Sequence, residues 1–193
     1  MSSLMQGKRI GFAMTGSFCT FERVLRILPE FIERGAEVTP ILSETAYGTD
    51  TRFMKAADVI GRMEEICGRK VLHTITQAEP IGPKKLLDLL IVAPATGNTL
   101  GKLACGITDT SVTMACKAHW RNGRPVILAV STNDGLSGSA ESIRRLSEKK
   151  NTFLLPYIQD DPVGKPDSLV AKMEMLPSFA EKILNEMRLK TEK

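Results

Sequence analysis

Short apolar runs alternate with amphipathic helical patterns along almost the whole chain, and no other feature limits the possible folds as strongly. The run 86–93 (LLDLLIVA) is almost entirely apolar, as is typical of a central strand covered on both faces. Helical spacing of apolar residues follows the first run, with Phe21, Val24, Leu25 and Leu28 on one side. This alternation predicts a Rossmann-like or flavodoxin-like three-layer α/β/α sandwich with an open, mostly parallel sheet.

The individual elements follow from the same patterns. We expect strands at 8–14, 37–42, 70–73, 86–93, 125–130 and 152–155. The intervening helices are expected at 21–34, 53–67, 100–107, 109–122 and 140–150. Segments 74–85 and 157–167 are predicted to be loops because of their prolines, and 169–190 a helix broken near Pro177. No linker or repeat interrupts the pattern, so residues 1–193 are expected to form a single flavoprotein-like α/β domain.

Composition excludes several classes of protein. The net charge is only +4, aromatic residues are 5% of the chain, and no block of five like charges occurs, which argues against a nucleic-acid surface. The four cysteines form no C-x-x-C pair and there are only two histidines, so we expect no metal site and reduced thiols. No apolar run reaches about 18 residues, so we expect a cytoplasmic protein without a membrane span.

The loop after the first strand, TGSFCT, is a candidate anion site. Parallel strands end at one edge of a sheet, and ligands of such folds bind there. Gly16, Ser17 and Phe18 stand where the strand turns into a helix, so free backbone amides and the helix dipole favour a phosphate. The loop is neither a Walker A nor a G-x-G-x-x-G sequence. An ordinary glycine turn with a serine N-cap therefore remains an equal alternative.

The segment PATGNT after the fourth predicted strand is more specific. Thr96, Asn98 and Thr99 place short polar side chains around Gly97, whereas capping the next helix needs only one of them. Asn98 offers both a donor and an acceptor, which suits a carboxylate or a ring amide of a ligand. We therefore predict a direct ligand contact, and a catalytic role, for Asn98.

Two other strand ends add polar residues to the same edge. Ser43 and Thr45 follow the second strand, and Thr132 and Asn133 follow the strand 125–130. Residues of these types also favour plain turns, so each is ambiguous alone. Their coincidence at one edge favours a ligand site, to which Arg52, Lys84 and Lys85 could add positive charge if their loops fold over it. His119 is expected to be a capping or surface residue, and Cys105 and Cys116 to be packing residues.

These motifs resemble the flavoprotein family that includes the FMN-dependent cysteine decarboxylases. In that family the first loop and a PASANT-like segment hold the flavin phosphate and ring. The matching motif positions here are Gly16, Ser17, Ala95, Thr96, Asn98 and Thr99. The resemblance implies FMN or another phosphate-bearing nucleotide as a possible cofactor. The decarboxylases carry a catalytic histidine after the second strand, where this chain reads SETAYGTDTR, and their PAMN-type segment is here STND.

Within that family the chain is similar to the dipicolinate synthase B subunits, from about Lys8 to Leu184 and including QDDPVGKPDSLVA. This similarity implies a role in sporulation, in the mother-cell cytoplasm, where dihydrodipicolinate is oxidised to dipicolinate. It also implies a partner, the dipicolinate synthase A subunit, that carries NAD(P), a small dicarboxylate substrate, and a homo-oligomer. The alternatives are an active FMN-dependent decarboxylase and a non-catalytic activating chain. The segment 157–168 is expected to help form the site shared with the partner, because long polar loops are often functional.

Overall fold

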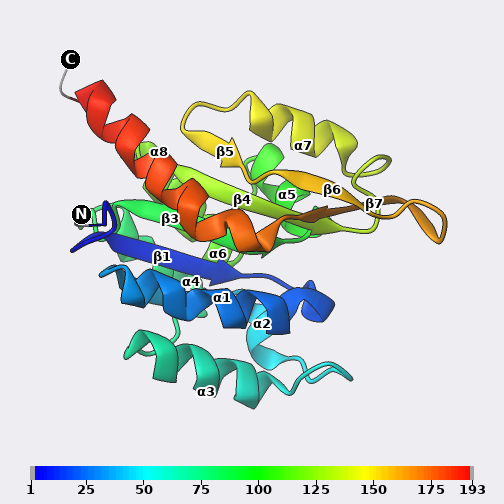
Figure 1. Ribbon diagram of the computed structural model, residues 1–193, viewed down its shortest axis with the longest axis horizontal. Coiled ribbons are helices and arrows are strands. Elements are labelled where there is room, and N and C mark those ends of the chain that lie inside the picture. The colour runs from blue at the N-terminus through cyan, green and yellow to red at the C-terminus, as the bar shows by residue number, and fades with distance from the viewer. Residues whose placement is uncertain (1–2, 192–193) are drawn as a thin grey trace.

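The computed structural model describes residues 3–191, and a seven-stranded sheet runs through its centre (Figure 1). The strand order is β2-β1-β3-β4-β7-β6, with β5 paired to the first half of β4. All pairs among β1 to β5 are parallel, whereas β7 pairs antiparallel with both β4 and β6 and is the one described strand of reversed direction. The strands are β1 Arg9–Met14, β2 Glu37–Leu42, β3 Leu89–Ala95, β4 Val126–Thr132, β5 Thr152–Leu154, β6 Tyr157–Asp161 and β7 Lys165–Ala171.

Helices cover both faces of the sheet. One core joins the sheet to α1 (Phe21–Glu33), α3 (Ala56–Cys67) and α8 (Leu176–Thr191). A second core on the other face joins it to α5 (Gly97–Ala104), α6 (Ser111–Arg121) and α7 (Ala140–Ser147), with the short α4 (Ile75–Ala78) alongside (Figure 1). The predicted three-layer α/β/α class with an open, mostly parallel sheet is confirmed. No helix within residues 3–191 is long and apolar enough to cross a bilayer.

The long apolar run in the sequence forms β3, which is covered by helices on both faces of the sheet. Every residue of LLIVAPA is buried. Leu89, Ile91 and Ala93 point into the first core, whereas Leu90 and Val92 point into the second, because side chains alternate along a strand. Ala95 also belongs to the second core, and the register with β4 shifts between Val92 and Ala95. The irregularity lies immediately before the predicted ligand loop.

The end of the chain differs from the prediction. The segment 157–167, expected to be a loop, forms β6 and the start of β7, which pair as an antiparallel hairpin. Helix α8 begins at Leu176 rather than 169, and Pro177 lies in its first turn, where a proline is tolerated. Strand β7 pairs with β4 only at Ser131 and Thr132, so the hairpin extends from the carboxyl edge of the sheet (Figure 1). The polar residues of β6 and β7 concealed this strand pattern.

Two shorter segments also differ. The expected strand 70–73 is reduced to one bridge between Leu72 and Ile41. The expected loop 74–85 contains α4 and a 3₁₀ turn, Glu79–Ile81. A capping box between Thr74 and Gln77 starts α4, and this signal is readable in the sequence. Helix α2 (Glu44–Gly48) similarly occupies the start of the polar segment after β2.

Candidate functional site

A cavity of about 760 Å³ opens at the carboxyl edge of the sheet. Strands β1 and β3 are neighbours, and the chain leaves them toward opposite sides, so the cavity lies at the topological switch point. Segments that follow β1, β2, β3 and β4 contribute to its wall, together with the β6–β7 hairpin. The lining residues are Gly16, Ser17, Phe18, Cys19, Thr20, Arg23, Arg52, Phe53, Thr96, Gly97, Asn98, Ser131, Thr132, Asn133, Asp160, Lys165, Ser168, Leu169 and Val170.

Three hydroxyl groups meet where β1 and β4 end. The Ser17 Oγ lies 2.8 Å from the Ser131 Oγ and 3.1 Å from the Thr20 Oγ1, and the hydroxyl oxygens of Thr20 and Ser131 are 3.0 Å apart. Ser17 makes no side-chain cap for the 3₁₀ turn that follows, so the alternative of a serine N-cap is wrong. Each hydroxyl can rotate its proton toward a neighbour or toward a ligand. This hydroxyl cluster therefore suits an anion in the adjoining cavity.

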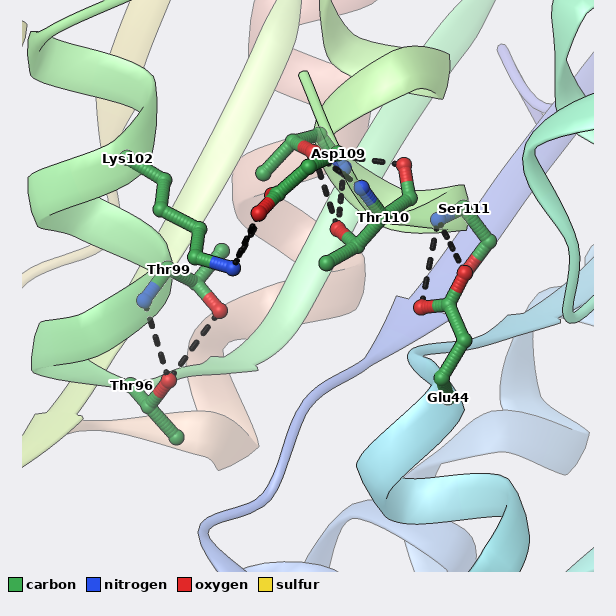
Figure 2. Close-up of polar contacts among 8 residues, drawn as sticks. Glu44, Thr96, Thr99, Lys102, Asp109, Thr110 and Ser111 are labelled. Atoms are coloured by element: carbon green, nitrogen blue, oxygen red, sulfur yellow. Dashed lines mark hydrogen bonds and ion pairs between the residues drawn. The ribbon is translucent and has the colours of Figure 1, made fainter. Parts of the chain in front are cut away.

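The loop after β3 uses its hydroxyls differently. Thr96 caps α5, because its Oγ1 accepts a hydrogen bond from the Thr99 amide at 3.2 Å, and the two hydroxyls also bond at 3.0 Å (Figure 2). The side chain of Asn98 is exposed and forms no hydrogen bond within residues 3–191. Of the polar side chains in PATGNT, Asn98 is thus the one that forms no hydrogen bond within the described residues, and its direct contact with a ligand stays a prediction.

Gly97 allows α5 to start very close to the loop after β4. A methyl group at this position would lie 2.5 Å from the Ser139 Oγ, 2.6 Å from the Thr132 Oγ1 and 2.9 Å from Asp134 Oδ1. Asp134 accepts hydrogen bonds from both hydroxyls, at 2.5 Å from Thr132 and 2.8 Å from Ser139. The Thr132 bond is the main cause that lowers the pKa of Asp134. As an ionised acceptor, Asp134 therefore holds the hydroxyl groups of Thr132 and Ser139 in place in this wall of the cavity.

The cavity carries more positive than negative charge. Its basic residues are Arg23, which pairs with Glu174, Arg52, which lies 4.8 Å over the Phe53 ring, and Lys165. The acidic lining residue Asp160 lies 3.7 Å from the Lys165 ammonium. Arg52 lies where the sequence predicted it. Lys165 and Asp160 were not predicted, because the hairpin that carries them has the composition of an irregular loop.

Some predicted residues lie outside the lining. Ser43 caps α2 by accepting from the Ala46 amide, and Ala95 is fully buried in the second core. Thr45 lies behind the wall, with its methyl group near Gly16. Lys84 and Lys85 precede β3 and so belong to the opposite, amino-terminal edge of the sheet, and the prediction that they fold over the site is wrong.

Thr99 is a further predicted residue that is absent from the lining. It is buried, and its hydroxyl serves the cap of α5 by bonding to Thr96. The sequence could not distinguish this role from a ligand contact, because Thr96, Asn98 and Thr99 are all short polar residues at a helix start.

The start of α6 forms polar contacts with the segments that follow β2 and β3. Figure 2 shows Glu44 of α2 accepting from the Ser111 amide, at 3.0 Å, while Lys102 of α5 pairs with Asp109 at 2.9 Å. Thr110 caps α6 through a reciprocal box with Thr113. These bonds connect α2, which follows β2, to the start of α6, and α5, which follows β3, to Asp109 just before α6. The loops on both sides of the switch point are therefore anchored to the same segment.

Both histidines lie outside the cavity lining. His73 stacks on Tyr47 with ring centroids 3.6 Å apart. His119 is completely buried in α6, and burial lowers its pKa to about 4, so the expected surface or capping role is wrong. Cys116 is buried as expected, whereas Cys105 is exposed at the end of α5. No cluster of three or more His, Cys, Asp or Glu suitable for a metal occurs in the described part of the chain.

The fold agrees with comparisons to known proteins. The family model described as "Flavoprotein" matches residues 1–188. The chain belongs to the flavoprotein family. Its sequence is 47% identical, over 98% of this chain and 94% of the relative, to the B subunit of dipicolinate synthase from Bacillus subtilis (strain 168).

Two solved structures extend the comparison. The crystal structure of the dipicolinate synthase B subunit from Bacillus halodurans C superposes with a TM-score of 0.86 and 42% identity, covering 94% of this chain and 93% of that one. The FMN-dependent cysteine decarboxylase SpaF gives a TM-score of 0.69 at 16% identity, over 95% and 98% of the two chains. The second similarity shows a common fold.

Proposed function

We propose that this flavoprotein acts as the B subunit of a dipicolinate synthase and, together with the A subunit of that enzyme, oxidises dihydrodipicolinate to dipicolinate. The observation that carries the proposal is the 47% identity to a dipicolinate synthase B subunit, which spans nearly the full length of both chains. The role would place the protein in the mother-cell cytoplasm of a sporulating bacterium, as a homo-oligomer that binds the A subunit.

The chemistry of the cavity supports a division of labour with the partner. The oxidation removes two hydrogens from the ring, as a hydride and a proton, and the hydride needs an acceptor. Asp160 is the single acidic side chain of the described lining, it faces Lys165, and the lining contains no histidine. This wall can bind and orient a ligand, but it offers little for proton transfer. We assign the NAD(P) that accepts the hydride to the A subunit.

The lining fits a phosphate-bearing nucleotide such as FMN. A volume of about 760 Å³ is in the range of small-molecule sites. The hydroxyl cluster of Ser17, Thr20 and Ser131 would hold the phosphate, together with the first amides of the turn Phe18–Thr20, which a helical turn leaves free. Arg23 and Arg52 would neutralise its charge. When bound, FMN would supply a redox-active ring.

Asn98 has the clearest role toward the reacting molecule. Its exposed amide can donate to a carboxylate of the substrate and accept from a ring N–H. Thr96 and Thr99 hold the first turn of α5 in place, so Asn98 projects from a fixed backbone. We propose that Asn98 orients the ligand and contributes to catalysis by positioning it.

An FMN-dependent decarboxylase is the second candidate, favoured by the fold shared with SpaF. Against it, neither histidine lines the cavity, since His73 stacks on Tyr47 and His119 is buried in α6. Purified protein that is yellow with FMN and releases CO₂ from a cysteinyl peptide would favour decarboxylation over the proposed function.

The proposed function is tested by following dipicolinate absorbance with this chain alone, the A subunit alone and both together, with NAD(P) in every reaction. We expect product only from the mixture. Full activity of this chain alone would contradict the shared enzyme. Full activity of the A subunit alone would reduce this chain to an accessory.

A further inference from the structure

A second cavity, of about 330 Å³, lies on the sheet face covered by α5, α6 and α7. Its walls come from the carboxyl end of α5 and the turn that follows, from one side of α6, and from the residue that follows α7 by two positions. The lining residues are Leu103, Gly106, Ile107, Thr108, Thr113, Lys117, Trp120, Arg121 and Lys149. None of them lines the cavity at the switch point. We call this second cavity the α6 pocket.

The charges of the α6 pocket are all positive. Lys117, Arg121 and Lys149 line it without any acidic side chain. None of these three cations forms an ion pair within residues 3–191, whereas the acids next to the lining in sequence have other partners. Asp109 pairs with Lys102, and Glu148 pairs with Arg144.

Contacts within the fold account for only part of this arrangement of three cations. Lys117 and Arg121 are four residues apart on α6, so their side chains are neighbours and like charges there destabilise a helix by about 0.2–0.5 kcal/mol. The helix dipole favours Arg121 in the last turn, but Lys117 lies a full turn earlier. Lys149 adds a third cation to this cluster, although its own position 4.8 Å over the Trp120 ring is stabilised by a cation–π contact. An anion between these groups would relieve the repulsion.

The remaining wall is apolar. Leu103, Ile107 and Trp120 line the pocket, and Ile107 is 46% exposed although it is a large apolar residue. We infer that the α6 pocket is a second binding site, distinct from the cavity at the switch point, for a small planar anion with carboxylates on an apolar or aromatic body. The cations would bind the carboxylates, and the apolar wall would cover the body of the ligand.

The experiment is a calorimetric titration of the full-length chain with benzene-1,3-dicarboxylate and with dipicolinate. Both titrations use the Ser17→Asp variant, in which the added carboxylate is expected to prevent anions from binding in the switch-point cavity. We expect binding that weakens with added NaCl, because exposed charges are screened. The neutral benzene-1,3-dicarboxamide should not bind. Only the choice of dipicolinate rests on the proposed function.

Substitutions then locate the site. Lys117→Gln combined with Arg121→Gln should weaken binding at least about tenfold, since charge-assisted hydrogen bonds are the strong ones. Lys149→Gln should weaken it several-fold, whereas Lys150→Gln, an exposed neighbour outside the lining, should not change it. Thermal unfolding checks that each variant is folded.

Two results would overturn the inference: equal effects of Lys149→Gln and Lys150→Gln, or no binding of either dicarboxylate. If the Ser17→Asp chain binds benzene-1,3-dicarboxylate and Lys149→Gln weakens that binding, while the wild-type chain supports no dipicolinate synthesis with its partner, the inference is upheld and only the proposed function is contradicted.

Discussion

The loops after β1 and β3 have similar sequences and similar positions, yet their hydroxyl groups make different contacts. In the first loop, Ser17 and Thr20 bond across the sheet edge to Ser131, and no side chain caps the following turn. In the second, Thr96 caps α5 and bonds to Thr99, which leaves Asn98 exposed. One loop therefore offers hydroxyls and amides to an anion, and the other offers a single carboxamide on a fixed helix start. Small polar residues alone do not reveal which of the two arrangements a loop adopts.

The largest expected effect comes from a charge placed in the first loop. Ser17→Asp should abolish binding of FMN or any other anionic ligand, because a carboxylate would stand beside the hydroxyl cluster. Flavin fluorescence or calorimetry measures the binding. Ser137→Asp introduces the same charge in the exposed loop after β4, outside the lining, and should bind normally. Unchanged binding by Ser17→Asp would place the anion site elsewhere.

Two substitutions in the loop after β3 should affect different quantities, one the activity and the other the stability. Asn98→Ala should lower dipicolinate formation by the two-chain enzyme at least about tenfold, the scale of a lost ligand hydrogen bond. Its unfolding free energy should change by less than about 1 kcal/mol, because the exposed side chain caps nothing. Thr96→Ala, which removes the cap, should lower stability by about 1 kcal/mol. Denaturant unfolding and the absorbance assay measure the two quantities. A stability loss for Asn98→Ala with normal activity would make Asn98 a structural residue.

The close approach of α5 to the loop after β4 predicts an effect on the free energy of unfolding. Gly97→Ala should destabilise the protein by roughly 1–3 kcal/mol, because its methyl group would overlap Ser139, Thr132 and Asp134. Gly101→Ala lies in the same helix, where the nearest atom is the Ser142 Oγ at 3.9 Å, and should be neutral or stabilising by up to about 1 kcal/mol. Urea unfolding of both variants measures the difference. Equal stabilities would mean that the loop after β4 can move away from α5 at no cost.

The fold and the edge that holds the site were predictable because they depend on patterns that local sequence encodes. A run such as 86–93 is typical of a covered strand, and parallel strands place TGSFCT, PATGNT and STND at one edge. The hairpin β6–β7 was missed because exposed strands rich in Asp, Lys and Pro lack an apolar alternation. Lys165 and Asp160 were missed with it.

Other parts of the site depend on contacts between distant residues. Ser17 contacts Ser131, which lies 114 positions later in the chain, so no local pattern distinguishes this bond from an N-cap. The crowding at Gly97 likewise comes from Ser139 and Asp134. His119 is buried because α6 packs on the sheet. The basic residues next to it in the sequence favoured an exposed position, so its burial was not predicted.

Participation of the switch-point cavity in the reaction of the two-chain enzyme can be measured directly. The quantity is the rate of dipicolinate formation by complexes rebuilt from the A subunit and either the wild-type chain or a chain carrying both Ser17→Asp and Asn98→Ala. Co-elution with the A subunit checks that the variant still assembles. We predict assembly with activity lowered by at least about a hundredfold, because Ser17→Asp should abolish binding of the anionic ligand and Asn98→Ala should by itself cost at least about tenfold. Wild-type activity of the assembled variant would contradict a role for the cavity and make the chain a non-catalytic activator.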